Sequence, residues 1–316
     1  MSYDKSDLPT FDQLPMLEEL KLRNSWGLFG GSDNLGTLNN IQNAERRNAL
    51  ASVVTGRTVN LTLELNQPNP PLYSRPSYEH VVFATGRNGN DDYVNSFYLQ
   101  GSTQWDGLRH IRAREFGFYG GLTEQFTPGG PDLGIEHWAK AGIIGRGVLV
   151  DLARYCASTG REYDPFSGEA VTSDLIERAA EHQGIVFSQG DILCLHFGWM
   201  ESYFGLTPDE QSTTIGRTTF AGLEGSEDVA RFLWDQHFAA VVCDNPAVEV
   251  SPGDAKVGSL HRRLIPMVGM VFGELFDFRE LAELCEERQR WDFLFVAVPL
   301  NIPGGVGSPG NAVALI

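Results

Sequence analysis

The densest group of potential metal ligands and proton carriers in this sequence lies within residues 100–110. In an extended strand, alternate side chains point to the same face. The polar side chains that would share one face here are Gln100, Gln104, Asp106 and His110. Burial of such groups is unfavourable unless they satisfy one another, a metal or a substrate. Spacing alone gives equal support to two interpretations. One is a functional strand, and the other is a polar edge strand or hydrogen-bonded loop.

A second polar pair lies far along the chain. His261 and Glu274 flank the apolar run 264–272, and we expect them to lie at two ends of one strand-and-loop unit. A neutral histidine and a carboxylate are suitable partners for a divalent ion. A single histidine such as His261 is more often a surface residue, so this pair does not decide the question by itself.

Four further side chains near these segments are candidates for a substrate pocket. They are Trp105, Tyr119, His196 and Trp199. Aromatic residues at this density suit a flat aromatic or lactone substrate. Each of them also has an ordinary interpretation, as a core aromatic residue or as a hydrogen-bonded histidine of the core.

The composition indicates an acidic globular protein. A chain of 316 residues with 42% hydrophobic residues can bury the core of one large domain or two ordinary ones. The formal net charge of -17 repels phosphate backbones and anionic membranes, so we expect neither nucleic acid nor a membrane as a partner. The scattered cysteines predict buried free thiols, and together with the lack of a signal-peptide pattern they favour a cytoplasmic location.

Short apolar runs alternate with helix patterns, mostly in the second half of the chain. We expect strands at 58–65, 80–84, 147–152, 191–196, 239–243 and 293–298. We expect helices at 173–182, 226–236 and 278–288. This interleaving predicts an α/β domain with a buried mixed sheet. Residues 1–24 are predicted to form an N-terminal arm over a neighbouring part of the molecule or another subunit, and residues 25–316 a single domain.

Two common enzyme signatures are missing from the sequence. No Gly-x-Ser-x-Gly elbow of a serine hydrolase occurs in it. The glycine-rich stretch 117–134 is not followed by the Gly-Lys-Ser or Gly-Lys-Thr of a phosphate loop. The sequence therefore indicates neither a nucleophilic serine nor a nucleotide cofactor.

The segment 100–110 resembles the motif of the cyclase family of small-molecule hydrolases, which includes bacterial kynurenine formamidase and isatin hydrolase. That motif is His-x-Gly-Thr-His-x-Asp-x-Pro-x-His, and this chain has Gln-Gly-Ser-Thr-Gln-Trp-Asp-Gly-Leu-Arg-His in the same register. Further blocks similar to the family are 26–27 with 34–39, 145–151, 190–193 with 198–199, 244–249, 261–274 and 299–301 with 307–309.

The resemblance implies a fold and a site. The fold is α/β, with a mixed sheet curled into a barrel-like core and helices outside it, as in the swivelling β/β/α cyclase-like fold, assembled as a homodimer or homotetramer. The resemblance also implies that Asp106 ligates a metal and that His110 is the catalytic acid/base. By the same resemblance, His261 and Glu274 supply further ligands.

This chain departs from the family motif where the metal-binding histidines should be. Gln100 and Gln104 replace both imidazoles, and the chain resembles a branch with this Gln-Trp-Asp form. A carboxamide oxygen is a neutral, hard donor and a weaker zinc ligand than imidazole. A metal set of Gln100, Gln104, Asp106, His261 and Glu274 therefore favours manganese or magnesium over zinc, or binds metal poorly.

The resemblance implies hydrolysis of a C–N amide or lactone bond in a small cyclic or aromatic metabolite. A divalent metal (manganese, magnesium or zinc) on Asp106 would activate water, and His110 would take its proton. Two alternatives remain open. One is a metal-free cyclase, dehydratase or isomerase that uses His110 and Asp106 as an acid/base pair. The other is a non-catalytic protein that binds a small molecule.

Overall fold

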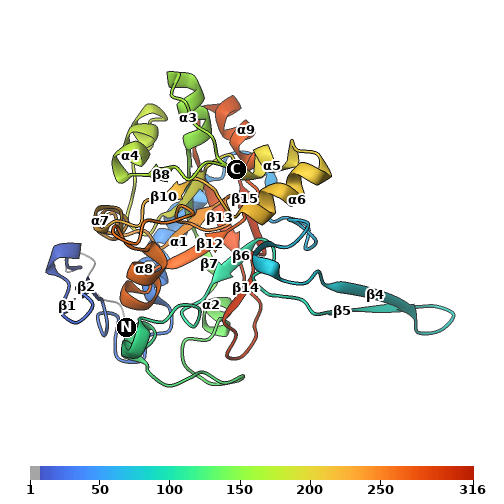
Figure 1. Ribbon diagram of the computed structural model, residues 1–316, viewed down its shortest axis with the longest axis horizontal. Helices are drawn as coiled ribbons and strands as arrows, with labels where there is room; N and C mark the ends of the chain where they lie inside the picture. Colours follow the sequence, from blue (N-terminus) through green and yellow to red (C-terminus); the bar gives the residue numbers. More distant parts are fainter. Residues whose placement is uncertain (1–7) are drawn as a thin grey trace.

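The computed structural model describes residues 8–316 of the chain. Within these residues the core is a nine-stranded mixed sheet that curls into a half-barrel with helices around it (Figure 1). In spatial order its strands are β14 (Gly307–Pro309), β6 (Gln104–Asp106), β12 (Val271–Glu274), β11 (Ala240–Cys243), β9 (Ile192–His196), β7 (Ile143–Asp151), β13 (Asp292–Ala297), β15 (Ala312–Leu315) and β3 (Thr58–Asn60). The predicted α/β class and curled mixed sheet are therefore confirmed.

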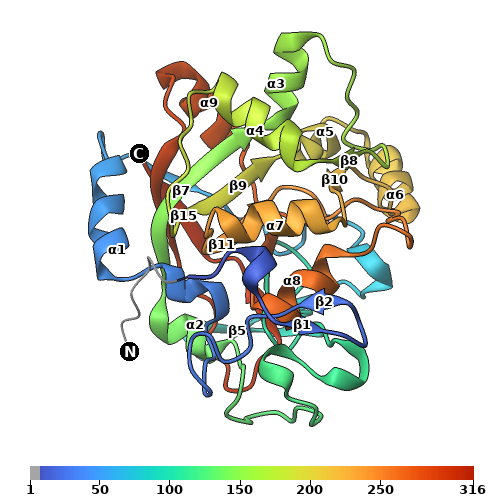
Figure 2. The same cartoon turned by 90° about the vertical axis from the view of Figure 1, so that its left-hand side faces the viewer.

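Helices pack around this sheet, and α4, α7 and α8 lie together on one side of it (Figure 2). The helices of the described part are α1 (Asn43–Ala49), α2 (Glu136–Ala141), α3 (Leu152–Thr159), α4 (Ser173–His182), α5 (Trp199–Phe204), α6 (Pro208–Arg217), α7 (Glu227–Asp235), α8 (Leu260–Val268) and α9 (Arg279–Arg288). The predicted helices at 173–182, 226–236 and 278–288 correspond to α4, α7 and α9. Side-chain oxygens of Thr172 and Ser226 cap the first turns of α4 and α7, which explains where these helices begin.

Four neighbouring strands of the sheet, β12, β11, β9 and β7, run parallel, and β6 is antiparallel to both β12 and β14. In the β6–β12 register Gln104 lies opposite Glu274, and Asp106 lies opposite Phe272. Residues directly opposite one another on antiparallel strands are side-chain neighbours on one face of the sheet. This register therefore joins the two polar segments that lie far apart in the sequence.

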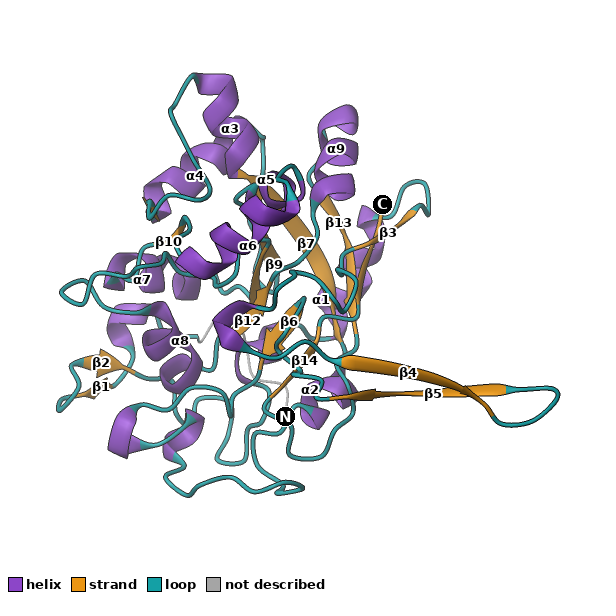
Figure 3. Cartoon of the chain, turned by 45° about the vertical axis from the view of Figure 1, so that its right-hand side comes forward, coloured by secondary structure: helices purple, strands orange, loops and turns teal. Residues whose placement is uncertain are grey.

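Three predicted strands differ from the structure. The run 58–65 is a strand only over β3 (Thr58–Asn60). The run 80–84 lies outside the main sheet, in a hairpin of β4 (Glu79–Ala84) and β5 (Asn90–Asn95) that projects from the body (Figure 3). Its placement in the buried sheet was wrong, since Val82 and Phe83 are exposed. The run between His261 and Glu274 is not a strand and loop but α8 followed by β12. A continuous apolar run fits a buried helix as well as a strand, so periodicity could not distinguish them.

Two smaller pairs of strands complete the fold. β8 (Ala170–Val171) pairs with β10 (Gly222–Leu223), and β1 (Met16–Leu17) pairs with β2 (Leu22–Arg23). The latter belongs to the predicted N-terminal arm, of which residues 1–7 lie outside the described residues. The indole of Trp234 on α7 donates to the Pro9 carbonyl oxygen, and Phe11 is buried. The described part of the arm thus packs on this same chain.

The cysteines are all buried and free, as their scatter predicted. Among residues 8–316 no helix combines the length and apolar character needed to cross a membrane.

Close backbone contact fixes the end of α8 against the N-terminal region. Gly36 has φ +58, and a Cβ atom there would lie 2.0 Å from the carbonyl oxygen of Gly269, the residue that ends α8. The Thr37 amide donates to the same oxygen at 2.9 Å. Only glycine allows this approach, because both the backbone conformation and the space exclude a side chain.

We expect Gly36→Ala to lower the free energy of unfolding by about 3 kcal/mol, from backbone strain and the forced separation of α8. Chemical denaturation would measure the change. Gly31→Ala is the matched control, because a Cβ atom at Gly31 meets nothing within 4 Å, and its effect should stay within about 0.5 kcal/mol. Equal stability of the two variants would contradict this account of the contact.

Candidate functional site

Strand β6 separates a polar face from an apolar one. Gln104 and Asp106 share one face, whereas Trp105 points the other way and packs edge-on against Phe276 and Phe295. The indole of Trp105 donates to the Gly310 carbonyl oxygen at 2.8 Å. Trp105 therefore lies in the core and does not line the polar site.

The predicted extended strand over 100–110 is correct only for residues 104–106. The chain turns after β6, where the His110 amide donates to the Gly107 carbonyl oxygen at 2.9 Å. Through this turn, and not through strand alternation, His110 Nε2 comes within 3.6 Å of Asp106 Oδ2. The His110 side chain is 28% exposed, so a small molecule can reach it from solvent.

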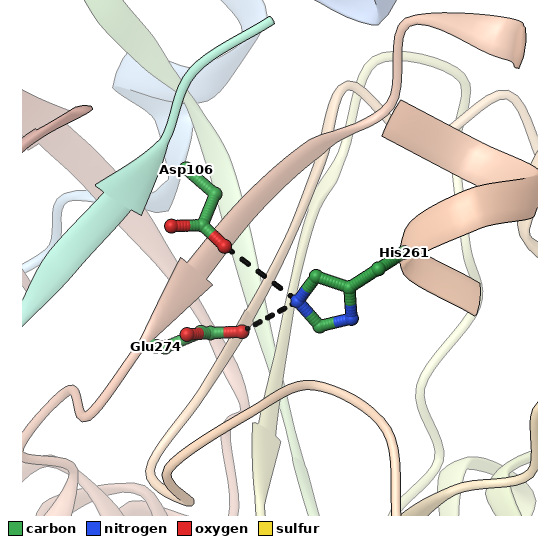
Figure 4. Close-up of side chains that lie close together, drawn as sticks. All are labelled: Asp106, His261 and Glu274. Atoms are coloured by element: carbon green, nitrogen blue, oxygen red, sulfur yellow. Dashed lines mark hydrogen bonds and ion pairs between the residues drawn. The ribbon is translucent and has the colours of Figure 1, made fainter. Parts of the chain in front are cut away.

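Asp106, His261 and Glu274 form the centre of the site (Figure 4). His261 Nε2 lies 3.1 Å from Glu274 Oε1 and 3.6 Å from Asp106 Oδ2. One ligand atom from each of the three residues lies within 4.8 Å of the others. Both carboxylates are buried, whereas the imidazole is partly exposed. This spacing is suited to a single divalent ion.

Glu249 holds the imidazole from the other side. Its Oε1 lies 2.6 Å from His261 Nδ1, and its carboxylate also accepts from the Ser259 hydroxyl and the Leu260 amide. Glu249 therefore both stabilises the start of α8 and orients the ring of its second residue. A carboxylate on Nδ1 leaves Nε2 directed at the centre, the arrangement that metal-binding histidines commonly have. Sequence reasoning did not single out Glu249, since only the fold of the loop before α8 brings it to His261.

The two glutamines donate to the two buried carboxylates. Gln104 Nε2 donates to Glu274 Oε2 at 2.6 Å, and Gln100 Nε2 donates to Asp106 Oδ1. Gln100 Nε2 also lies 3.2 Å from His110 Nδ1. Gln104 Oε1 is buried and has no hydrogen-bond partner among the described residues. An unpaired buried oxygen of this kind requires a partner such as a water or a cation.

The charges of the site shift its pKa values in opposite directions. Burial would raise the pKa of Asp106, but His110, His261 and the Gln100 hydrogen bond outweigh burial and lower it. Burial and the neighbouring Asp106 charge raise the pKa of Glu274. Burial would lower the pKa of His261, but its three carboxylate partners raise it well above its usual value. Three carboxylates around one imidazole thus favour a cation at this point, either the protonated ring or a metal ion.

These residues fit a divalent metal. Asp106 and Glu274 offer carboxylate oxygens, and His261 offers an imidazole nitrogen whose ring Glu249 already orients. The unpartnered Gln104 oxygen is a further neutral donor on the same face of β6. This donor set has more oxygen than nitrogen, which is typical of sites for hard cations.

Three other residues predicted to line a substrate pocket lie elsewhere. The Tyr119 hydroxyl donates to Asp33 at 3.0 Å, and Trp199 stacks on Tyr203 in a separate apolar cluster. His196 is fully enclosed at the carboxyl end of β9. Within residues 8–316, none of the three makes a hydrogen bond, ion pair or ring contact with Asp106, His261 or Glu274. Each of the three has a role in the packing or hydrogen bonding of the core. That they also line a substrate pocket stays a prediction.

His196 belongs to a second buried group of charges. Its Nδ1 lies 3.1 Å from Asp151 Oδ1, and its Nε2 lies 3.8 Å from Asp244 Oδ2. These residues lie at the carboxyl ends of the parallel strands β7, β9 and β11. Burial would lower the pKa of His196, but the two aspartates outweigh burial and raise it to about 9. Burial raises the pKa of Asp244 to about 6.

Tyr73 is a residue near the site that the sequence did not reveal. Its hydroxyl donates to the Pro246 carbonyl oxygen at 3.4 Å, and its φ of 59° places it in the left-handed region. Burial and the charges of Glu274 and Asp106 raise the pKa of its hydroxyl. Tyr73 therefore lies within electrostatic reach of the centre and stays protonated, so it remains a hydrogen-bond donor.

Comparisons with known proteins agree with this architecture. The sequence model of the family Cyclase matches residues 59–250. A crystal structure described as a novel cyclase is 31% identical, with a TM-score of 0.82, covering 94% of this chain and 100% of that chain. None of the curated proteins matches the sequence significantly.

Two isatin hydrolases share the fold at lower identity. Isatin hydrolase A from Labrenzia aggregata, bound to benzyl benzoate, is 15% identical with a TM-score of 0.57, covering 84% of this chain and 94% of its own. An isatin hydrolase bound to the product analogue thioisatinate is 15% identical with a TM-score of 0.58, covering 87% of this chain and 99% of its own. At this identity the likeness concerns the fold alone.

The buried His196 group predicts a pH dependence of stability. The folded pKa of His196 is about 9, above the unfolded value of 6.5, so its contribution is complete below pH 6.5 and is lost as pH rises toward 9. We expect the free energy of unfolding to fall across this window, and His196→Gln to remove that part of the decline. Denaturant titrations at several pH values would measure it. His80→Gln on the exposed β4 hairpin should keep the decline, and an unchanged slope in His196→Gln would contradict the assignment.

Proposed function

The chain belongs to the Cyclase family, and from that premise we propose that it is a metal-dependent hydrolase of a C–N amide or lactone bond in a small cyclic or aromatic molecule. The observation that carries the proposal is the meeting of Asp106, His261 and Glu274 beside the solvent-accessible His110. The shared fold with isatin hydrolases, whose named substrate is a cyclic amide, supports the choice of bond.

The metal chemistry would come from one ion held by Asp106, His261 and Glu274, with Gln104 Oε1 as a neutral donor. Such an ion supplies Lewis-acid activation of water and of the substrate carbonyl. The protein contributes a preformed set of donors, because Glu249 fixes the His261 ring and Gln104 fixes the Glu274 carboxylate.

His110 would carry the proton between the attacking water and the leaving group. When Gln100 donates to Nδ1, a neutral His110 has its proton on Nε2, next to Asp106 Oδ2 and open to solvent. That form suits protonation of a leaving nitrogen or oxygen. Acceptance of a proton from water at Nε2 requires the other tautomer, in which Nδ1–H moves away from the Gln100 N–H while Gln100 Nε2 keeps its hydrogen bond to Asp106 Oδ1.

A second candidate function is metal-free acid/base catalysis, such as cyclisation, dehydration or isomerisation. The observation that favours it is the pairing of both carboxylates with carboxamides, since Gln100 donates to Asp106 and Gln104 donates to Glu274. In this arrangement protein groups alone satisfy the carboxylates, and His110 with Asp106 remains an acid/base pair.

One experiment separates the candidates. Protein treated with chelator would be assayed on isatin, aryl formamides and aromatic lactones, before and after addition of Mn²⁺, Mg²⁺ or Zn²⁺. Turnover that requires an added ion and is lost in Asp106→Asn supports the hydrolase. Full turnover without any ion supports the metal-free enzyme. Tight binding of these compounds without turnover in any condition would support a non-catalytic binding protein.

His110 provides a direct test of the proton-transfer step. We expect His110→Ala to lower kcat by about 100-fold or more, because a positioned acid/base group contributes at least that much. The fold should remain intact, since the side chain lies at the accessible edge of the site. Steady-state kinetics and thermal unfolding would be measured together. Near-native turnover by a folded His110→Ala protein would remove this residue from the mechanism.

Gln100 and Gln104 determine which kind of ion we expect and how tightly it is bound. With Gln100 and Gln104 in place of imidazoles, we expect the bound ion to be a hard cation such as Mn²⁺ or Mg²⁺ that chelator removes readily. The double variant Gln100→His with Gln104→His should bind Zn²⁺ more than about tenfold more tightly. Calorimetry and metal analysis would measure this, with Gln125→His, an exposed residue, as the control for an added imidazole. Stoichiometric zinc that survives chelator in the unchanged protein would contradict the prediction.

A further inference from the structure

A cavity of 730 Å³ lies beside Glu249, the carboxylate that contacts His261 Nδ1. Glu249 and Tyr73 belong to its wall, and these two residues connect it to the centre through His261 and through the field of Asp106 and Glu274. The cavity therefore lies beside the proposed centre, with Glu249 between its wall and His261.

Two arginines in the wall of this cavity have free charges. Arg263 is engaged, because it donates to two backbone carbonyl oxygens and lies 3.8 Å from Glu227. Glu249 is engaged with His261 and the start of α8. By contrast, the guanidinium groups of Arg114 and Arg262 have no hydrogen bond or ion pair within residues 8–316, and both residues are exposed.

These two unpaired positive charges occur in a chain that is strongly negative overall. The chain carries a formal net charge of -17, and the adjoining site gathers the carboxylates of Asp106, Glu249 and Glu274. Such surroundings repel an anionic molecule unless local positive charge offsets them. An arginine pair at the cavity supplies that charge and can bind a carboxylate through paired N–H groups.

The rest of the wall fits the body of an aromatic molecule. Its apolar residues are Leu20, Leu22, Phe220, Ala247, Val250 and Ala255, and Ser251, Asp254 and Ser259 are polar members of the same wall. Apolar walls with a few placed polar groups are typical of small-molecule sites. Arg262 follows His261 directly on α8, and Arg114 begins a short 3-10 turn four residues after His110.

We propose that the substrate carries a carboxylate, and that Arg114 and Arg262 bind this group while the ring packs on the apolar wall and the scissile bond faces the Asp106 centre. The inference rests on the proposed function, whose substrate class it narrows to acidic aromatic or cyclic amides and lactones. Arg114 and Arg262 are specificity residues in this scheme and take no part in proton transfer.

The test compares benzoate with benzamide, which have the same ring and differ in charge. Binding to the full-length protein would be measured by calorimetry or NMR titration. We expect benzoate to bind about tenfold more tightly than benzamide, as charge-assisted hydrogen bonds imply. Arg114→Gln with Arg262→Gln should remove this preference and leave benzamide binding unchanged. Arg178→Gln, which removes an exposed positive charge on α4, is the matched control and should keep the preference.

Two outcomes would overturn the inference. One is equal affinity for benzoate and benzamide in the unchanged protein. The other is a preference for benzoate that survives in the double arginine variant but is lost in Asp106→Asn, which would assign the carboxylate to the metal centre instead. Failure of the proposed function is a separate result, because a protein without hydrolase activity could still show the arginine-dependent preference.

Discussion

A positive charge between carboxylates is the interaction on which the site depends. His261 lies among Asp106, Glu249 and Glu274, two of them almost fully buried. Ionised carboxylates at such close range raise one another's pKa and are costly to bury without a cation. An imidazolium would satisfy the carboxylates, and a divalent ion in its place would do so with release of the proton from Nε2. The same geometry therefore suits both of the proposed functions.

The scaffold holds this charge cluster in place through rigid elements. Asp106 and Glu274 come from adjacent strands in a fixed antiparallel register, and His261 comes from the first turn of α8. The other end of α8 is held by the close contact of Gly36 with Gly269. Side chains anchored on strands and helices keep their positions better than side chains on loops, which favours a preformed site.

Sequence reasoning recovered the central strands and helices α4, α7 and α9, because local apolar patterns and cap residues determine those features. It could not supply the pairing of Gln104 with Glu274, since strand register between distant segments depends on the whole sheet. It missed Glu249 and Tyr73 because each reaches the site from a loop or short turn with no periodic pattern.

Sequence reasoning assigned the region before β12 to a strand because a uniformly apolar run has no distinguishing period. Trp105 was assigned to the pocket by proximity in sequence, although alternation along β6 turns it toward the core.

The two glutamines are best understood through the direction of their hydrogen bonds. An imidazole that binds a metal directs a lone pair at it, whereas Gln100 and Gln104 direct N–H groups at Asp106 and Glu274. Each carboxylate is thereby oriented, so that Asp106 Oδ2 faces both histidines and Glu274 Oε1 faces His261. Compared with the two histidines of the family motif, the glutamines would thus remove two nitrogen ligands and orient the carboxylate ligands that remain. An ion held by three strong donors would keep coordination positions for water and substrate, and this favours ions that exchange such ligands readily.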